Sequence, residues 1–314
     1  MTLLPALTAK VRAAAHPGST GDAPCPCGGG ALAERPDATV VRHADTVAKA
    51  HAPGTDPAEL SLRLAMAARL PDALLPPLDL APAPLGDRLV TFWPYGAPVD
   101  PDTPEAAPWE ATGALLAHLH RAAPLDGLPP MRGPAKAARA ISRLRTALRG
   151  APHPAAGPVL QAWAALPAWA RAEAPMPGTP TLCHGDLHLG QLVRHPAPDG
   201  PWRLIDVDDL GVGVPAWDLA RPAAWYACGL LPPDEWTRFL GAYQRAGGPA
   251  VPMAGDPWPV LDVPARALTV QTAALALAKA LAAGRELDEV EQQLVGACVR
   301  MAPIPHQLVS EHTG

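Results

Sequence analysis

Polar side chains gather between residues 181 and 206 of a chain that is otherwise rich in apolar residues. The stretch TLCHGDLHLGQLV at 181–193 contains Asp186 and Gln191, and the stretch WRLID at 202–206 ends on Asp206. The two apolar pieces are joined by RHPAPDG, and this pattern predicts a β-hairpin that brings the three side chains together. Carboxylate and amide oxygens are the ligands that Mg²⁺ prefers, so we predict a magnesium site beside a substrate phosphate.

The composition limits the class of protein. The chain has 314 residues, 48% of them hydrophobic, with 18% charged residues and a net charge of −5. This is enough apolar material for a sizeable core, and it lacks the basic patch that a nucleic-acid partner would need. No apolar run approaches transmembrane length, and the proline-broken N-terminus does not suit a secretory signal. We therefore expect a cytoplasmic protein with no membrane partner; the oligomeric state stays open.

Two residue counts bear on the site. The chain has four lysines and no asparagine, so each lysine is informative and a side-chain amide must come from glutamine. The five cysteines form an odd, scattered set that is typical of reduced thiols: Cys25, Cys27, Cys183, Cys228 and Cys298. The Cys-Pro-Cys stretch could be half of a metal site. No second Cys/His pair at zinc spacing accompanies it, so we expect free thiols there.

The first 96 residues have the pattern of a small β-rich unit. Short runs divided by polar turns predict strands at 31–34, 39–43, 46–52, 77–81 and 88–93. A capping box predicts a helix between the third and fourth of these strands, because Asp56 can cap it, Pro57 suits its first position and Glu59 stands at its third. The segment PYGAPVDPDTPEAAP then breaks all regularity and reads as a hinge.

The rest of the chain has mainly helical periodicity. Helices are predicted at 108–123, 134–150, 157–173, 216–230, 234–246, 259–283 and 286–302. The fold class is therefore α+β, with a small strand-rich N-terminal lobe at 1–96 and a large, mainly helical lobe at 97–314. A cleft between lobes is the usual place for a ligand.

The two motifs in the polar stretch point to a family. HGDLHLGQ followed by LIDVDDLGVGVPAWDLA resembles the phosphotransferases that include aminoglycoside phosphotransferases and choline kinases, which share the protein-kinase-like fold. The family pattern is H-G-D-x-x-x-x-N, then I-D-x-x-x-x-G-x-x-x-x-D. The resemblance covers most of the chain, and it implies ATP, Mg²⁺ and a small-molecule hydroxyl acceptor.

The resemblance assigns roles to the residues of the first motif. Asp186 matches the catalytic aspartate that orients the acceptor hydroxyl. Gln191 stands where the family usually has a metal-binding Asn, and it also resembles the Gln of maltokinase-like enzymes. His184 would hold the loop by hydrogen bonds. His188 could line the substrate side, with a structural role as the alternative.

The second motif carries acidic residues. Asp206 matches the aspartate that holds Mg²⁺, and Asp218 matches the one that ties the catalytic loop, with a helix cap as its alternative role. Asp208 could assist at the metal or substrate. For Asp209 we expect a solvated turn. Val214 stands where the family often has Asp, so one loop contact is missing.

The N-terminal lobe should hold the nucleotide phosphates. Lys49 resembles the strand lysine that contacts the α- and β-phosphates, and Glu59 is its expected acidic partner unless the capping box already occupies it. Gly28 and Gly29, in CGGGA, suit a phosphate-covering loop. The turn ERPDA at 34–38 could serve instead.

The hinge stretch TFWPYG should meet the adenine. Adenine recognition needs a backbone N–H and a C=O, and Pro94 has no N–H, so Tyr95 is the expected donor. Trp93 lies beside it and could equally be a core residue.

The leading hypothesis is an ATP-dependent small-molecule O-kinase. Aminoglycosides are polycations and need a carboxylate-lined pocket, for which the acidic run ELDEVE at 286–291 could serve unless it is a solvated face. A sugar, an amino sugar or another antibiotic fits equally well, so both antibiotic resistance and ordinary metabolism stay open. The alternative is a non-catalytic nucleotide-binding pseudokinase, favoured by Gln191, Val214 and the irregular glycine loop.

Overall fold

The computed structural model describes residues 3–18, 25–150 and 152–301, and the chain divides into two compact units. The first unit comprises Met1–Ala107, Pro124–Pro129 and Leu189–Asp208, and the second comprises Pro108–Ala123, Pro130–His188 and Asp209–Gly314. These units do not follow the predicted division into 1–96 and 97–314. The difference arises because the chain returns to the first unit for the hairpin that carries Gln191 and Asp206.

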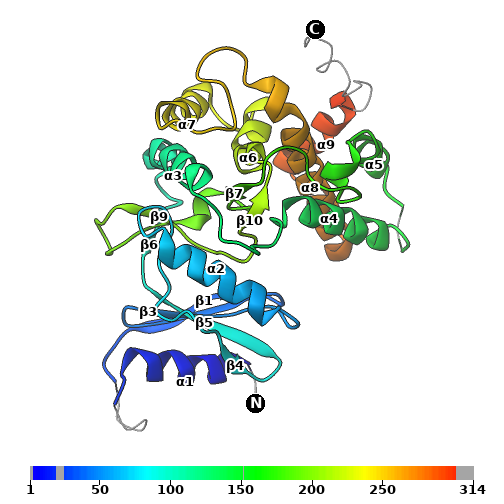
Figure 1. Ribbon diagram of the computed structural model, residues 1–314. Helices are drawn as coiled ribbons and strands as arrows, with labels where there is room; N and C mark the ends of the chain where they lie inside the picture. The colour runs from blue at the N-terminus through cyan, green and yellow to red at the C-terminus, as the bar shows by residue number, and fades with distance from the viewer. Residues whose placement is uncertain (1–2, 19–24, 151, 302–314) are drawn as a thin grey trace. The chain divides into compact units, whose positions relative to one another are not determined.

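An antiparallel five-stranded sheet forms the centre of the first unit, in the order β1-β2-β3-β5-β4 (Figure 1). Its strands are β1 (Gly29–Glu34), β2 (Thr39–His43), β3 (Thr46–Ala50), β4 (Ala83–Leu85) and β5 (Arg88–Pro94). Four of the predicted strands are confirmed. The strand predicted at 77–81 is wrong, and β4 forms a few residues later. As an edge strand, β4 tolerates Pro84, which cannot donate a backbone hydrogen bond.

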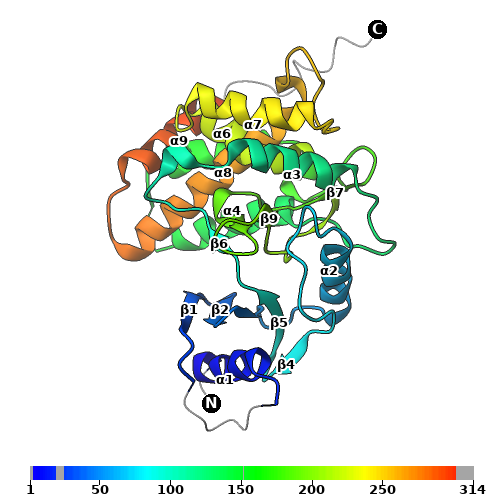
Figure 2. The same ribbon diagram turned by 90° about the vertical axis from the view of Figure 1, so that its left-hand side faces the viewer.

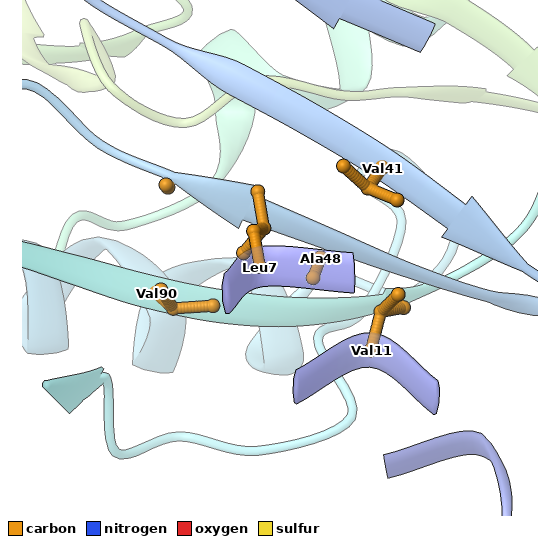
Figure 3. Close-up of a cluster of buried hydrophobic side chains, with 6 residues drawn as sticks. Leu7, Val11, Val41, Ala48 and Val90 are labelled. Carbon is orange, nitrogen blue, oxygen red and sulfur yellow. The ribbon is translucent and has the colours of Figure 1, made fainter. Parts of the chain in front are cut away.

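Two helices accompany this sheet. Helix α1 (Leu3–Ala15) was not expected from the sequence, because Pro5 obscures its i, i+4 apolar spacing. It lies along one face of the sheet in both views, where Leu7 and Val11 pack against buried residues of β2, β3 and β5 (Figures 1, 2 and 3). Helix α2 (Pro57–Arg69) is the predicted one, and Asp56 caps it by accepting hydrogen bonds from two backbone N–H groups at 2.8 and 3.0 Å.

The predicted hairpin is confirmed as β8 (Leu192–Arg194) and β9 (Trp202–Leu204), and β6 (Ala97–Pro98) pairs with β8. Leu204 holds it to the segment after α2 through its N–H to Ala73 O and its carbonyl to Leu75 N, both at 2.9 Å. Leu192 faces Leu204 in the register, so Gln191 and Asp206 meet at the open end of the hairpin.

The second unit is mainly helical. Its helices are α3 (Trp109–Arg121), α4 (Gly133–Ala147), α5 (Ala156–Ala164), α6 (Ala216–Ala227), α7 (Pro233–Arg245), α8 (Trp258–Ala283) and α9 (Glu289–Met301). Each predicted helix is present, although the one predicted at 157–173 stops at Ala164. Pro167 interrupts it, and a short 3₁₀ turn, Ala168–Arg171, follows. The α+β fold class is confirmed.

Helix α8 is the central helix of this unit. It packs against α4, α5, α6 and α9, which lie around it in both views (Figures 1 and 2). By length and composition alone it is apolar enough to span a membrane, contrary to our expectation that no run approaches that length. However, 67% of the apolar window is buried inside the unit, which is the pattern of a core helix.

A two-stranded sheet positions the loops of the second unit. Strand β7 (Thr181–Cys183) pairs antiparallel with β10 (Gly211–Gly213), and Cys183 faces Gly211. The loop after β7 and the residues before β10 therefore lie at the same end of this sheet. The segment that enters α4 lies beside them, because Met131 N donates to Val212 O at 3.0 Å.

Candidate active site

A buried lysine lies between two carboxylates in the first unit. Lys49 Nζ is 2.6 Å from Asp206 Oδ1 and 2.9 Å from Asp208 Oδ2, and its side chain is 11% exposed. Burial alone would lower the pKa of Lys49, but the two carboxylates raise it above its usual value. Lys49 is therefore a fixed positive charge at neutral pH.

Asp208 also contacts His51, which connects it to Thr91 of strand β5. His51 Nδ1 lies 2.8 Å from Asp208 Oδ1, a close electrostatic contact outside hydrogen-bond alignment. On its other side, His51 Nε2 is 2.9 Å from Thr91 Oγ1, which accepts a hydrogen bond from Trp93 Nε1 at 2.8 Å. The Thr91 hydroxyl accepts from Trp93, and the tautomer of His51 sets which member of the Thr91–His51 pair donates. Sequence reasoning placed His51 in the predicted strand at 46–52 without a role, because only the fold brings its side chain to Asp208.

Asp206 has an unusual backbone at the end of the hairpin. Its φ is 66°, in the left-handed region that few residues other than Gly, Asn and Asp adopt. Its side chain is 35% exposed, and Gln191 Nε2 lies 3.5 Å from its Oδ2. The Gln191 amide thus turns its nitrogen toward Asp206, and its oxygen must turn to the ion for the pair to offer Mg²⁺ a carboxylate and an amide oxygen, the ligand types that this ion prefers.

The second unit contains a separate charged group. Asp186 Oδ2 is 2.6 Å from Lys136 Nζ, and its Oδ1 is 3.0 Å from Arg221 Nη2. Lys136 also contacts Asp209 Oδ2 at 2.7 Å. Burial alone would raise the pKa of Asp186, but Lys136 and then Arg221 lower it to about 2. Asp186 is therefore ionised throughout the physiological pH range.

Sequence reasoning missed Lys136 and Arg221, and it was wrong about Asp209. The Asp209 side chain is only 14% exposed and is paired with Lys136, so it is no solvated turn. The scarcity of lysine was the available signal for Lys136, which lies in the first turn of α4. Arg221 gave no signal, because only the fold of α6 brings it to Asp186.

Residues around Asp186 fix the loop that carries it. Asp218 Oδ2 accepts from His184 N at 2.6 Å and its Oδ1 accepts from Gly185 N at 2.7 Å, which are the contacts that a loop-tying role needs. Gly185 has φ 85°, and a Cβ there would lie 2.4 Å from Asp209 O. The loop therefore requires glycine before Asp186.

His188 follows Asp186 in the same loop. Burial lowers the pKa of His188 to about 4, although Asp186 acts in the opposite direction. The imidazole is neutral at pH 7 and does not supply a positive charge to the loop.

A small, partly open hollow lies beside Asp186 within the second unit. Its lining residues are Gly133, Lys136, Gly185, Asp186, Leu187, Trp217, Arg221, Leu268 and Gln271. Gly133 allows the close approach of the Trp217 indole, because a Cβ there would lie 2.2 Å from the indole nitrogen. The hollow combines an aromatic ring, an amide and charged groups, as ligand sites commonly do.

A model of a phosphotransferase enzyme family matches residues 33–262. The chain belongs to this family. A search of curated protein sequences finds no match.

Solved structures of phosphotransferases have the same fold. A choline/ethanolamine kinase family protein from Mesorhizobium loti has a TM-score of 0.57 at 19% identity, over 95% of this chain and 96% of that one. Spectinomycin phosphotransferase APH(9)-Ia, in complex with ADP and spectinomycin, gives 0.53 at 12% identity, over 89% and 93%. A thermostable mutant of aminoglycoside phosphotransferase APH(4)-Ia, with AMP-PNP and hygromycin B, gives 0.54 at 14%, over 91% and 95%. The predicted protein-kinase-like fold is confirmed.

In this phosphotransferase, Glu59 is not the partner of Lys49. Its Oε2 accepts from Arg63 Nη1 at 3.1 Å, one helical turn along α2, whereas Lys49 binds Asp206 and Asp208. Glu59 stands in the first turn of α2, where its backbone N–H donates to the capping residue Asp56.

The two glycines expected to cover the phosphates lie at the wrong end of the phosphotransferase sheet. Gly29 faces His43 and Gly28 O accepts from Ala44 N, at the far end of β2. Lys49 faces Val40, next to the turn at 35–38. The structure thus favours the alternative turn as the loop near Lys49.

The backbone N–H of Tyr95, which was expected to recognise adenine, already donates a hydrogen bond within the protein. Tyr95 N donates to Asp45 O at 2.7 Å, and Tyr95 O lies 3.0 Å from His195 Nδ1. Tyr95 is therefore not a free hinge donor. Trp93 is 8% exposed and hydrogen-bonded to Thr91, which favours its core alternative.

Proposed function

We propose that this phosphotransferase transfers the γ-phosphoryl group of Mg-ATP to a hydroxyl of a small, uncharged or anionic molecule. The observation that carries the proposal is the ionised Asp186 beside a hollow of its own unit, with Lys136 and Arg221 on its two oxygens. The nucleotide complexes of the structural neighbours, with ADP and AMP-PNP, support nucleotide use.

Lys49, Asp206 and Gln191, the polar residues described in the first unit, would bind the nucleotide phosphates and their metal ion. Lys49 supplies a fixed positive charge, and Asp206 and Gln191 would hold Mg²⁺, which neutralises the phosphate charge when bound. Lys49 must exchange part of its pairing with Asp206 and Asp208 for phosphate oxygens. Asp208, held between Lys49 and His51, would then keep the lysine in place.

Asp186 would orient the acceptor hydroxyl. A carboxylate with a pKa of about 2 is a weak base, so it contributes charge and direction more than early removal of the proton. This suits phosphoryl transfer, in which positioning and electrostatic stabilisation do most of the catalysis. Lys136 and Arg221 would keep this carboxylate charged and fixed.

The charges around the hollow favour an acceptor that is not a polycation. Its lining contains the cations Lys136 and Arg221 and the carboxylate Asp186, and Asp209 pairs with Lys136, so the charges balance, whereas an aminoglycoside site would need an excess of carboxylates. Trp217 and Gln271 offer an aromatic face and an amide, which suit a hydroxyl-bearing ring such as a neutral sugar. A role in antibiotic resistance stays a prediction.

The acidic run at 286–291 gives no support to a cationic acceptor. Glu291 binds Arg285 through both carboxylate oxygens at 2.7 Å, and Asp288 accepts from Glu291 N at 2.9 Å. These contacts begin helix α9, so the run serves the local structure.

A screen of ADP release tests the proposal. Wild-type protein with Mg-ATP is incubated with neutral sugars, amino sugars, aminoglycosides and other hydroxylated antibiotics, and GTP is compared with ATP. We expect acceptor-dependent ADP release with at least one neutral hydroxyl compound and weaker release with aminoglycosides. Faster turnover of polycations would contradict the acceptor class. Binding of Mg-ATP or Mg-GTP without turnover of any acceptor would favour the non-catalytic nucleotide-binding alternative, and failure of both nucleotides to bind would contradict the kinase itself.

A further inference from the structure

Two histidines and two cysteines from three separate segments of the sequence meet in the first unit. His16 follows α1, Cys25 and Cys27 precede β1, and His43 ends β2. One ligand atom from each lies within 4.8 Å of every other. His16 Nε2 is 3.1 Å from both His43 Nε2 and Cys25 Sγ, and Cys25 Sγ is 3.4 Å from His43 Nε2.

We propose that this cluster, which we call the Cys₂His₂ cluster, binds one structural Zn²⁺ ion. Zinc–nitrogen and zinc–sulfur bonds in a tetrahedral site place ligand atoms about 3.3–3.8 Å apart, close to the separations of the three measured pairs. Four protein ligands close the coordination shell, as in structural zinc sites. The sequence reading expected free thiols, because neither histidine stands near a cysteine at zinc spacing.

The ligand chemistry suits zinc. Two thiolates and two neutral imidazoles bring the net charge of the loaded site to zero, and loading releases one proton from each thiol. The four ligands are only partly buried, so the ion has access from solvent.

Local structure brings the cluster together. Gly29 faces His43 across β1 and β2, and a Cβ on Gly29 would lie 2.4 Å from Arg42 O. The absence of a side chain at Gly29 thus lets the chain after Cys27 approach β2. A bound ion would tie the end of α1 to this edge of the sheet, in addition to the apolar contacts of Leu7 and Val11.

A second group of potential metal ligands differs from the Cys₂His₂ cluster. His120, Cys183 and Asp218 are buried and close together. Both oxygens of Asp218 already accept backbone hydrogen bonds, from His184 N and Gly185 N, and His120 Nε2 lies 3.0 Å from Asp218 Oδ2. This group is explained by the catalytic loop. In the Cys₂His₂ cluster, by contrast, the contacts join the potential ligands to one another.

Metal content and cobalt substitution of the full chain test the proposal. Protein stripped by a chelator under a reducing agent is reloaded with Zn²⁺ or Co²⁺, and the metal is counted by mass spectrometry. We expect about one ion per chain, as in single structural sites. The cobalt form should show thiolate charge-transfer bands and the visible bands of tetrahedral coordination.

Variants assign the site. The double variant C25S/C27S and the variant His16→Ala should lose the ion and the cobalt spectrum, whereas the controls Cys228→Ser and His153→Ala should keep both. Chelation of wild-type protein should lower its Tm, and zinc should restore it, a comparison that needs no variant to fold. No stoichiometric metal under reducing conditions, or a cobalt spectrum kept by C25S/C27S, would overturn the proposal. A Cys25–Cys27 disulfide as the stable form would overturn it too, and a thiol count before and after reduction detects it.

Discussion

Lys136 and Asp186 form an ion pair of 2.6 Å inside the second unit, and Lys136 is the principal group that lowers the pKa of Asp186. Burial acts in the opposite direction and would raise this pKa. The proposed catalytic carboxylate is thus kept charged by a residue outside both sequence motifs. The predictions below start from this relationship.

Replacing Lys136 should make the activity sensitive to acid. In the wild type Asp186 has a pKa of about 2 and stays charged across the working range. In Lys136→Met the pKa of Asp186 rises, so kcat/KM should fall as the pH drops through the new value. The control is Lys279→Met, on an exposed position of α8. Identical pH–rate profiles for the wild type and Lys136→Met would show that the pair does not govern the charge of Asp186.

Asp206 and Asp208 should differ when each is changed to Asn. Asp208→Asn leaves Lys49 without one of its two carboxylates and should lower the free energy of unfolding by about 1–2 kcal/mol, less than for a fully buried pair. Asp206→Asn keeps a side chain that tolerates φ 66° and should mainly raise the Kd for Mg-ATP. Denaturant unfolding and calorimetric titration measure the two effects. The reverse pattern would exchange the proposed roles.

Gln191 should behave as a ligand of the proposed magnesium ion. Gln191→Ala should raise the Mg²⁺ concentration needed for half-maximal activity, because one oxygen ligand is lost. Gln191→Asn should keep measurable activity, since it retains the amide. A magnesium titration of ATP turnover measures both. A wild-type magnesium requirement in Gln191→Ala would mean that Gln191 only packs beside Asp206.

Residues of the hollow should act on the acceptor alone. Gln271→Ala, in the lining, should raise the acceptor KM several-fold and leave the ATP KM unchanged, because the nucleotide group belongs to the other unit. The matched control Gln292→Ala, on α9 outside the lining, should change neither constant. An unchanged acceptor KM in Gln271→Ala, or a raised ATP KM, would place the acceptor elsewhere.

Sequence patterns predicted the elements well because their signals are local. The cap Asp56, the alternation in β2 and β3, and the helical periodicity of the second unit each depend on neighbouring residues. The sequence analysis did not predict helix α1, because Pro5 near its start interrupts the apolar spacing of its buried face. The strand predicted at 77–81 is absent because Pro76 precedes the segment and Pro77 begins it, and the strand forms farther along as β4.

The charged partners could not be predicted, because they come from distant segments. Asp186 meets Lys136 across 50 positions of sequence, and Lys49 meets Asp206 across 157. The motifs identified Asp186, Asp206 and Gln191, yet not the cations that set their charge. The sequence likewise did not predict that His16 and His43 contact the cysteines, because they lie in other segments of the chain. A sequence pattern gives residue types, and the topology decides which charges meet.

The most direct test of the central claim compares Asp186→Asn with wild type on an acceptor found in the screen. The substitution keeps the size of the side chain and removes the charge that orients the hydroxyl. We predict that kcat for ADP release falls by a factor of about 10² or more, the scale of general acid–base contributions, while the Kd for Mg-ATP stays at the wild-type value. Full turnover by Asp186→Asn would contradict the assignment of HGDLHLGQ as the catalytic loop and, with it, the proposed reaction.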